Sequence, residues 1–259
     1  MLRAMTFNLR FANERDGDDA WSLRRELVAR LIEEQAPDVL GTQEGLTSML
    51  DWLAERLAPA YALHWPAGRA RDQNSQYPSL FVRDASLELL AGGDRWLSPT
   101  PEQPLSKGWD SAFPRMMSWA RLRQRAGGRE LVAVATHLDH LGDIARPNQA
   151  RLLADFAAEC TEPVLVMGDF NDAPGSPTHR ALLEQRTGLG DCWQALELGE
   201  GQPAWTAHRF DGRPRKGRLD WILASPALRC SAIAKVERQD DGRWPSDHFP
   251  VRADLTWVE

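Results

Sequence analysis

Several features that mark common protein classes are missing from this sequence. Its 259 residues include only three cysteines, Cys160, Cys192 and Cys230, which are widely separated and odd in number. A disulfide framework or a zinc knuckle is therefore not expected, and a reducing compartment fits this cysteine usage. No apolar run reaches the roughly eighteen residues of a membrane-spanning helix. The N-terminal segment lacks the long apolar stretch of a secretory signal, so we expect a cytoplasmic protein.

Strong basic character is missing as well. The net charge is −6, and the arginines are scattered along the chain. Proteins that hold long nucleic acids usually present a basic surface, so the charge argues against such a partner and is compatible with a small phosphate-bearing molecule. The sequence contains no Gly-x-Ser-x-Gly, Walker A or dinucleotide-binding glycine pattern. Serine hydrolases, P-loop enzymes and nicotinamide-dependent enzymes therefore have no motif support.

What is present is the composition of a globular protein, with 42% hydrophobic and 26% charged residues. No internal repeat, low-complexity segment or linker divides the chain, so we expect a single domain over residues 1–259. Eleven tryptophans against two tyrosines is unusual, and we expect most of the tryptophans to pack in the core.

Hydrophobic periodicity predicts strands that are interspersed with helices. Strands are expected at 2–9, 38–44, 61–65, 79–82, 87–96, 116–122, 131–136, 164–168, 218–224, 232–237 and 251–257. Helices are expected over 45–57, 146–159 and 176–184, and between Ser22, interpreted as a helix cap, and Pro37. Irregular segments occupy 97–114 and 199–217. The first of these is long, and long irregular loops in compact domains are usually functional or disordered.

Polar residues with oxygen or imidazole groups stand at the ends of these strands. They are Asn8, Glu44, His137, Asp169, Asn171, Asp220, Asp247 and His248. A single residue of this kind is most simply explained as a turn cap, but several of them at one end of stacked sheets indicate a shared cleft. Carboxylate and amide oxygens suit Mg²⁺ or Mn²⁺, and histidines add general acid–base capacity. This chemistry suits hydrolysis of a phosphate ester.

The motifs that contain these residues follow one another in a recognisable order. They are Thr-Phe-Asn8-Leu-Arg, Thr-Gln-Glu44, Thr-His137-Leu-Asp-His, Gly-Asp169-Phe-Asn171, Leu-Asp220-Trp-Ile and Ser-Asp247-His248-Phe-Pro-Val. The set resembles the endonuclease/exonuclease/phosphatase superfamily, which includes abasic-site endonucleases, deadenylases, neutral sphingomyelinases and inositol polyphosphate 5-phosphatases. The resemblance is strongest to bacterial members known only as metal-dependent hydrolases, which share the segments Ser106–Asp110 and Pro114–Trp119.

The resemblance implies an α/β fold, a four-layer α/β/β/α sandwich in which two mostly antiparallel mixed sheets pack face to face. It implies a divalent-metal-dependent phosphoesterase that hydrolyses a phosphate mono- or diester of a small or medium substrate by direct in-line attack of water. One alternative is a nuclease acting on DNA or RNA. Another is a non-catalytic binding module on the same fold. The presence of a catalytically competent residue at every motif position argues against this alternative.

The resemblance also implies roles for individual residues. Metal ligands for Mg²⁺ or Mn²⁺ would be Asn8, Glu44 and Asp247. Catalytic residues would be Asp169, which handles the attacking water, His137 and Asn171, which hold phosphate oxygens, and Asp220, which fixes the ring of His248. Substrate-binding candidates are Arg10, Lys107, Trp109, Asp110, Arg115 and His140, with the loops 66–77 and 97–115 as pocket walls. Arg10 stands where nuclease members often carry an acid, and Trp109 or Arg115 would fill the space of a tyrosine that abasic-site enzymes use.

Overall fold

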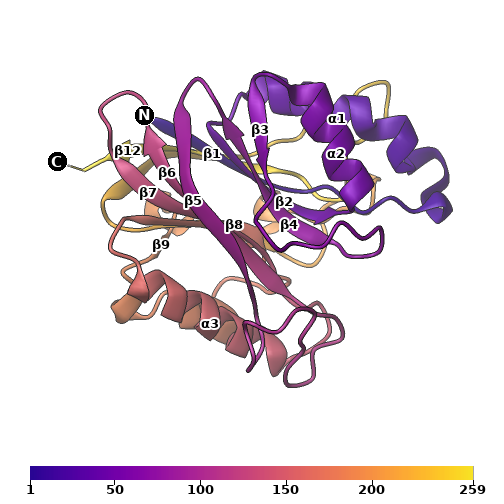
Figure 1. Cartoon of the computed structure of the whole chain (residues 1–259). Coiled ribbons are helices and arrows are strands. Elements are labelled where there is room, and N and C mark those ends of the chain that lie inside the picture. The colour runs from indigo at the N-terminus through magenta and orange to yellow at the C-terminus, as the bar shows by residue number, and fades with distance from the viewer. Residues whose placement is uncertain (259) are drawn as a thin grey trace.

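Strands with alternating side-chain faces build two six-stranded sheets in the computed structural model, which describes residues 1–258 without the side chain of Gln185 (Figure 1). The first sheet contains, in spatial order, β11 (Leu228–Lys235), β12 (Val251–Trp257), β1 (Leu2–Asn8), β2 (Val39–Gly45), β4 (Tyr77–Arg83) and β3 (Tyr61–His64). The second contains β5 (Leu87–Trp96), β6 (Met116–Gln124), β7 (Glu130–His137), β8 (Val164–Asp169), β10 (Asp220–Ala224) and β9 (Gly190–Asp191).

Each sheet has one parallel pair of strands at its centre, and the other pairings in the described chain are antiparallel. In the first sheet β1 runs parallel to β2, and α1 (Trp21–Gln35) connects the two strands. In the second sheet β7 runs parallel to β8, and α3 (Ala145–Glu159) connects them. Because ligands bind beyond the carboxyl ends of parallel strands, these two units mark the edge of the molecule at which a site is expected.

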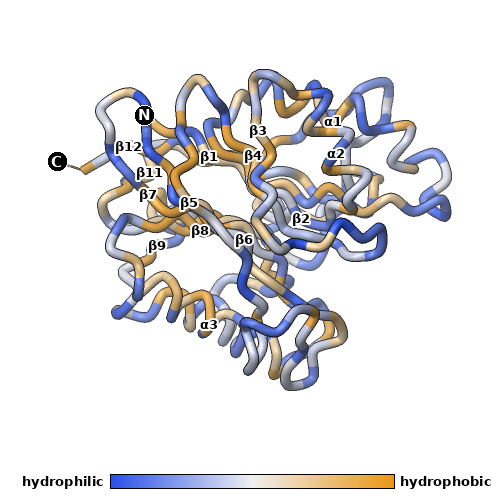
Figure 2. Tube along the Cα trace, in the orientation of Figure 1, coloured by the Kyte–Doolittle hydropathy of each residue, from blue (hydrophilic) through white to orange (hydrophobic). Residues whose placement is uncertain are grey.

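Three apolar layers hold the sheets and helices together. Ala4 and Leu165 belong to the cluster between the two sheets, whereas Met5 faces α1 and α2 (Thr47–Leu57), and Val166 faces α3. The period-two alternation of these strands therefore gives both sheets two buried faces. Figure 2 shows the resulting concentration of hydrophobic residues along the central strands.

The helices lie on opposite outer sides of the paired sheets, with α1 and α2 on one side and α3 on the other (Figure 1). The predicted four-layer α/β/β/α sandwich is thus confirmed. A short helix, α4 (Pro177–Leu182), follows β8, and 3-10 turns lie at Glu14–Asp19, Gln185–Thr187, Gln194–Leu196 and Gln202–Ala204. None of the helices within residues 1–258 has the length and apolar character needed to traverse a bilayer.

Three local predictions were wrong. Helix α1 begins at Trp21, and its N-cap residue is Ala20, which has no side-chain hydrogen bond; Ser22 lies inside the helix. Strand β10 begins at Asp220 because the Thr206 hydroxyl accepts the backbone N–H groups of Leu219 and Asp220. Strand β11 begins at Leu228, four residues before the predicted start at residue 232, because a register shift against β12 interrupts its alternation.

Candidate active site

Strand pairing brings the polar strand ends together. In the second sheet His137, Asp169 and Asp220 occupy the same level on three neighbouring strands, because His137 pairs with Asp169 and Asp220 pairs with Asp169. In the first sheet Asn8 ends β1 and pairs with Gln43, the residue before Glu44. The two sheets thus present their acidic and amide side chains at one common edge.

A bulge in β2 sets the direction of Glu44. The pairing of β2 with β4 shifts register between Thr42 and Gly45, and Glu44 has a φ of 62°. A bulge of this kind re-aims a side chain and is often found beside active sites. Positive φ recurs at four other non-glycine residues that line the same cavity, Arg10, Leu105, Asn171 and Lys216. Strained backbone is thus concentrated around this cavity.

Asn8 connects the two sheets through its amide. Its Nδ2 donates to Asp169 Oδ2 at 2.9 Å and to Glu44 Oε1 at 3.2 Å. Its Oδ1 accepts the backbone N–H of Arg10 at 2.9 Å. Asn8 and Asp169 are almost completely buried, so this contact fixes the separation of the β1 and β8 ends.

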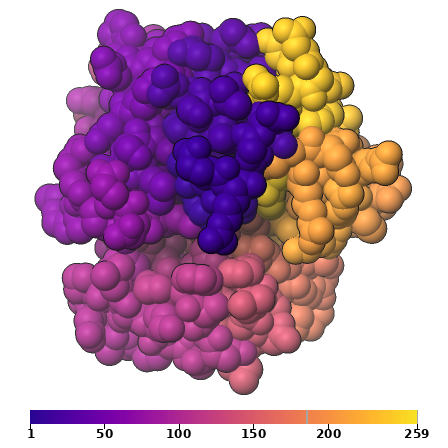
Figure 3. All heavy atoms as spheres, turned by 90° about the vertical axis from the view of Figure 1, so that its right-hand side faces the viewer, coloured from indigo at the N-terminus to yellow at the C-terminus, as the bar shows by residue number. Residues whose placement is uncertain are grey.

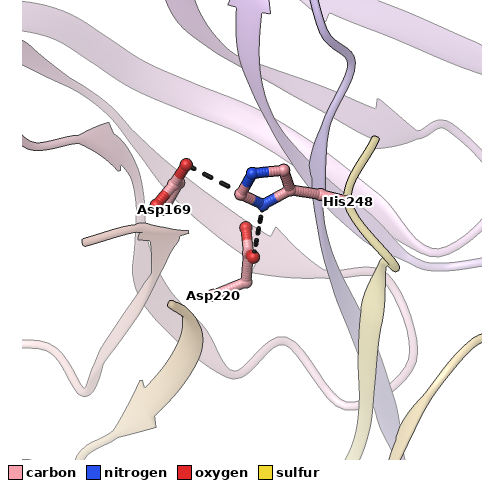
Figure 4. A group of neighbouring side chains, drawn as sticks. All are labelled: Asp169, Asp220 and His248. Atoms are coloured by element: carbon pink, nitrogen blue, oxygen red, sulfur yellow. Dashed lines mark hydrogen bonds and ion pairs between the residues drawn. The ribbon is translucent and has the colours of Figure 1, made fainter. Parts of the chain in front are cut away.

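Asp169, Asp220 and His248 form a compact group, and the side chains of both acids point toward the imidazole ring (Figure 4). His248 Nδ1 lies 2.8 Å from Asp220 Oδ2 and 3.9 Å from Asp169 Oδ2. His248 comes from the segment before β12 in the first sheet, whereas both acids belong to the second sheet. The group therefore depends on the packing of one sheet against the other.

Burial and mutual charge shift the titration of this group. Burial, together with the negative charge of Asp220, raises the pKa of Asp169 to about 7, although His248 and the bonds from Asn171 and Asn8 act in the opposite direction. Burial lowers the pKa of His248, but the surrounding carboxylates of Asp220, Asp169 and Asp247 outweigh it and raise that pKa well above its ordinary value. The imidazole is thus held as a cation beside two acids.

His137 and Asn171 form a second pair at the cavity. Asn171 Nδ2 donates to Leu138 O and to His137 Nε2, both at 3.0 Å. Burial, with the neighbouring charge of Arg115, lowers the pKa of His137 well below its ordinary value. His137 Nδ1 is buried and has no hydrogen-bond partner within residues 1–258. The ring is therefore neutral, and both amide N–H groups of Asn171 are used inside the protein.

A cavity of about 600 Å³ opens at this shared edge. Its polar lining includes Glu44, His137, Asp169, Asn171 and His248. Its walls include 74–78 and residues within 96–116, so parts of both predicted wall loops, 66–77 and 97–115, line it. Figure 3 shows the molecular surface hollowed between the indigo-to-purple N-terminal part and the magenta-to-pink segment below it.

Three of the predicted substrate-binding residues line the cavity, namely Arg10, Arg115 and His140. Arg10 forms a two-bond ion pair with Asp16. Arg115 is 8% exposed, its Nη2 lies 3.1 Å from His140 Nδ1, and its buried Nε has no hydrogen-bond partner within residues 1–258. That Nε lies 3.6 Å from Asp139 Oδ2, an ion pair that holds the guanidinium at the cavity wall, where it is suited to an anionic ligand.

The other three predicted substrate-binding residues do not contribute to the cavity lining. Lys107 Nζ donates to the carbonyl oxygen of Ala112, within its own loop. The carboxylate of Asp110 accepts the backbone N–H groups of Ile144 and Ala145 and so caps α3. Trp109 is 43% exposed.

Further lining residues were not singled out as site residues in the sequence, although Pro114 and Met116 lie in the shared segment Pro114–Trp119. They are Phe11, Asn74, Ser75, Gln76, Tyr77, Pro78, Trp96, Leu105, Phe113, Pro114, Met116 and Lys216. Phe113 stacks on the His140 ring at a centroid distance of 5.7 Å. The signals for this wall in the sequence are the two long irregular loops and the apolar and aromatic residues within them.

The oxygen donors at the cavity fit a hard divalent cation. The Glu44 carboxylate lines the cavity, whereas the half-buried Asp247 carboxylate lies outside the lining and has no hydrogen bond shorter than 3.4 Å in the described chain. Asn8 Oδ1 is a neutral oxygen that accepts the backbone N–H of Arg10, so it would bind a cation only by giving up that bond; no sulfur is involved. Such a set suits Mg²⁺ or Mn²⁺.

A second group of potential ligands consists of Asp169, Asp220 and His248, whose ligand atoms lie within 4.8 Å of one another. The nitrogen available there, His248 Nδ1, is already engaged with Asp220. A metal at this group would have to displace that hydrogen bond and also the proton of a histidine held as a cation, so the Glu44 side of the cavity fits a metal ion better.

Comparisons with known proteins agree on one family. The model of the Endonuclease/Exonuclease/phosphatase family matches residues 5–248. The comparison with curated proteins finds no match. Among solved structures, an endonuclease/exonuclease/phosphatase family protein from Bacteroides thetaiotaomicron is 28% identical, with a TM-score of 0.88 over 100% of this chain and 98% of that chain.

Two further structures are informative. A mannosyl-6-phosphatase from Bacteroides thetaiotaomicron is 27% identical, with a TM-score of 0.86 over 99% of this chain and 100% of that chain. D. rerio TDP2, solved with a single-strand DNA product, is 18% identical, with a TM-score of 0.77 over 98% of each chain. At 18% identity, the likeness to TDP2 shows a shared fold alone.

Proposed function

Because this chain belongs to the endonuclease/exonuclease/phosphatase family, we propose that it is a divalent-metal-dependent hydrolase of phosphate esters with a small or medium substrate. Members of this family act on phosphoester bonds. The observation that carries the proposal is the position of Asp169, which lines the cavity between the amide of Asn8 and the ring of His248. A carboxylate held there is within reach of a water molecule in the cavity.

The proposed reaction is a direct displacement at phosphorus. Asp169 orients the attacking water and accepts its proton, a new P–O bond forms, and the bond to the leaving oxygen breaks on the opposite side. The cationic ring of His248, held by Asp220, stabilises the negative charge that develops on the phosphate oxygens. A divalent ion held by Glu44, Asn8 and Asp247 would supply further charge stabilisation.

His137 and Asn171 are proposed to contact the phosphate oxygens, together with Arg115. In the structure both N–H groups of Asn171 are used by Leu138 and His137. A bound phosphate would therefore take over the N–H that Asn171 now donates to His137. His137 Nε2, released from Asn171, would then have to carry the ring proton itself in order to donate to a phosphate oxygen.

The proposed substrate is a phosphorylated small molecule, with sugar phosphates as the first class to test. The mannosyl-6-phosphatase aligns with nearly all of this chain, and its name describes a phosphatase of a phosphosugar. A cavity of about 600 Å³ has the size of a small-molecule pocket. The net charge of −6 gives no support to a long nucleic acid.

The first experiment compares wild type with Asp169→Asn on p-nitrophenyl phosphate and bis-p-nitrophenyl phosphate, with Mg²⁺ or Mn²⁺. We expect metal-dependent hydrolysis that the substitution lowers by about 100-fold or more. Asp172→Asn is the matched control, because that carboxylate binds the Thr178 hydroxyl and does not line the cavity. Hydrolysis that is absent from wild type on both esters, or equal in wild type and Asp169→Asn, would contradict the proposal.

The substrate class is decided by a second comparison. Hexose 6-phosphates and other sugar phosphates should be hydrolysed with a higher kcat/KM than single-stranded or abasic DNA oligonucleotides. The opposite ranking would favour a nuclease on the same fold.

A further inference from the structure

Arg24, on α1, is among the largest side chains with no exposed surface. Its guanidinium makes four hydrogen bonds in the described chain, and every acceptor is a backbone carbonyl oxygen. Nε donates to Asp19 O at 2.8 Å and Nη2 donates to Arg10 O at 2.6 Å. Nη1 donates to Leu9 O at 2.6 Å and to Pro245 O at 2.9 Å.

A buried charge without a carboxylate bound to it is costly for the fold. Burial lowers the pKa of Arg24 to about 10, so the group is still protonated at neutral pH. The rings of Trp21 and Phe210 lie 5.2 Å and 5.4 Å from the guanidinium carbon and stabilise the cation only weakly. An apolar residue would fill the same space on this helix at lower cost, so the arginine needs another explanation.

Three of the four carbonyls that Arg24 binds belong to the two segments that carry proposed metal ligands, and the fourth, Asp19 O, lies just before α1. Leu9 and Arg10 directly follow Asn8 at the end of β1. Pro245 lies two residues before Asp247. A second link joins the same segments, since the Ser246 hydroxyl donates to Asn8 O at 2.6 Å.

We propose that Arg24 is a positioning residue that holds the segments of Asn8 and Asp247 in the arrangement required to bind the divalent metal. The inference rests on the proposed function, because the metal ligands are assigned there. The planar fork of a guanidinium directs its donors along several fixed directions at once, which matches carbonyls from separate segments. Without it, these buried carbonyls would lack partners and the two segments would move apart.

The test measures Mn²⁺ binding directly, by the electron paramagnetic resonance signal of the free ion, on folded protein without substrate. Arg24→Met and Arg24→Lys should each weaken Mn²⁺ binding by about tenfold or more. Lysine keeps the charge but donates from a single nitrogen, so it should not restore wild-type affinity. Arg3→Met is the matched control. Arg3 lies at the opposite end of β1, donates to Gln35 O and pairs with Asp254, so its loss should leave the Mn²⁺ Kd unchanged.

Wild type is titrated first, which separates the two proposals. If wild type binds no Mn²⁺, the metal dependence of the proposed function fails and the positioning role fails with it. If wild type binds Mn²⁺ and folded Arg24→Met has the same Kd, the positioning role alone is overturned. Ser246→Ala decides the question if the Arg24 variants do not fold, because it removes the second link. Weaker Mn²⁺ binding by that variant is the expected result, and an unchanged Kd would contradict the proposal.

Discussion

Asp220 Oδ2 lies 2.8 Å from His248 Nδ1, across the junction between the two sheets. Asp220 begins β10 in the second sheet, and His248 precedes β12 in the first. The contact orients the imidazole and keeps it cationic, so a charge at the cavity depends on how the sheets pack.

Asp220→Asn should therefore lower kcat by about 100-fold while the protein stays folded, because the amide no longer fixes the ring or its charge. Steady-state kinetics with a phosphate ester and a thermal melt measure the two effects. A matched control is His179→Gln, which removes another buried histidine–aspartate pair, with Asp191 at 2.9 Å, outside the cavity lining. The control should cost stability and leave kcat within about twofold; an equal loss of kcat in both variants would count against the assigned role.

Removal of the divalent metal should abolish activity, and Mg²⁺ or Mn²⁺ should restore it. Glu44→Gln should raise the metal concentration for half-maximal activity by about tenfold or more, because the carboxylate also accepts bonds from Asn8 and Phe11 that an amide cannot fully replace. Glu55→Gln, on an exposed position of α2, is the control. Full activity after exhaustive chelation would refute the metal dependence.

Arg115→Met should raise KM for the phosphate ester by about tenfold, since a buried guanidinium at the cavity wall would be lost. Arg115→Lys should restore little, because the three N–H groups of lysine share one nitrogen and lack the planar fork that reaches His140 and a ligand from separate nitrogens. Lys107→Ala is the control, because Lys107 is a cation whose Nζ donates to Ala112 O and does not line the cavity. The KM of this variant should stay within about twofold of the wild-type value. A larger rise in KM from Lys107→Ala than from Arg115→Met would contradict this assignment. It would place the substrate against the side of the loop 97–115 that carries Lys107.

Asp139 gives a prediction about stability and pH. Its buried carboxylate accepts backbone N–H groups of Ala112, Phe113, Leu141 and Gly142. Burial alone would raise its pKa, but these bonds outweigh burial and lower the pKa to about 2. The folded pKa lies below the unfolded value of about 3.9, so the stabilisation, about 2 kcal/mol, is present above pH ~4 and is lost as pH falls toward 2.

Asp139→Asn should therefore lower the free energy of unfolding by about 2 kcal/mol at pH 7, with a difference from wild type that shrinks below pH ~4. Urea unfolding at several pH values measures this difference. Asp143→Asn, an exposed carboxylate in the same turn, should change stability by less than about 0.5 kcal/mol. A difference between wild type and Asp139→Asn that stays constant down to pH 3 would disagree with the lowered pKa.

Much of the fold could be predicted because its signals are local. Alternation in strands such as β8, and the apolar spacing of α1 and α3, are readable within a short window of sequence. Start positions were less accurate: α1 begins at Trp21 without a side-chain cap, and β10 is shortened by a hydroxyl from Thr206, a residue in a distant loop. Long-range hydrogen bonds of this kind leave no periodic trace.

The sequence by itself determined that acids, amides and imidazoles stand at strand ends, because each follows or precedes an apolar run along the chain. Only the tertiary structure decided which side chains share the cavity. It places Lys216 and Tyr77 on its wall, uses Asp110 to cap α3, and buries Arg24 against the loops beside Asn8 and Asp247. The physical reason is that strand register is specified by alternation, whereas loop positions depend on hydrogen bonds and packing between segments far apart in sequence.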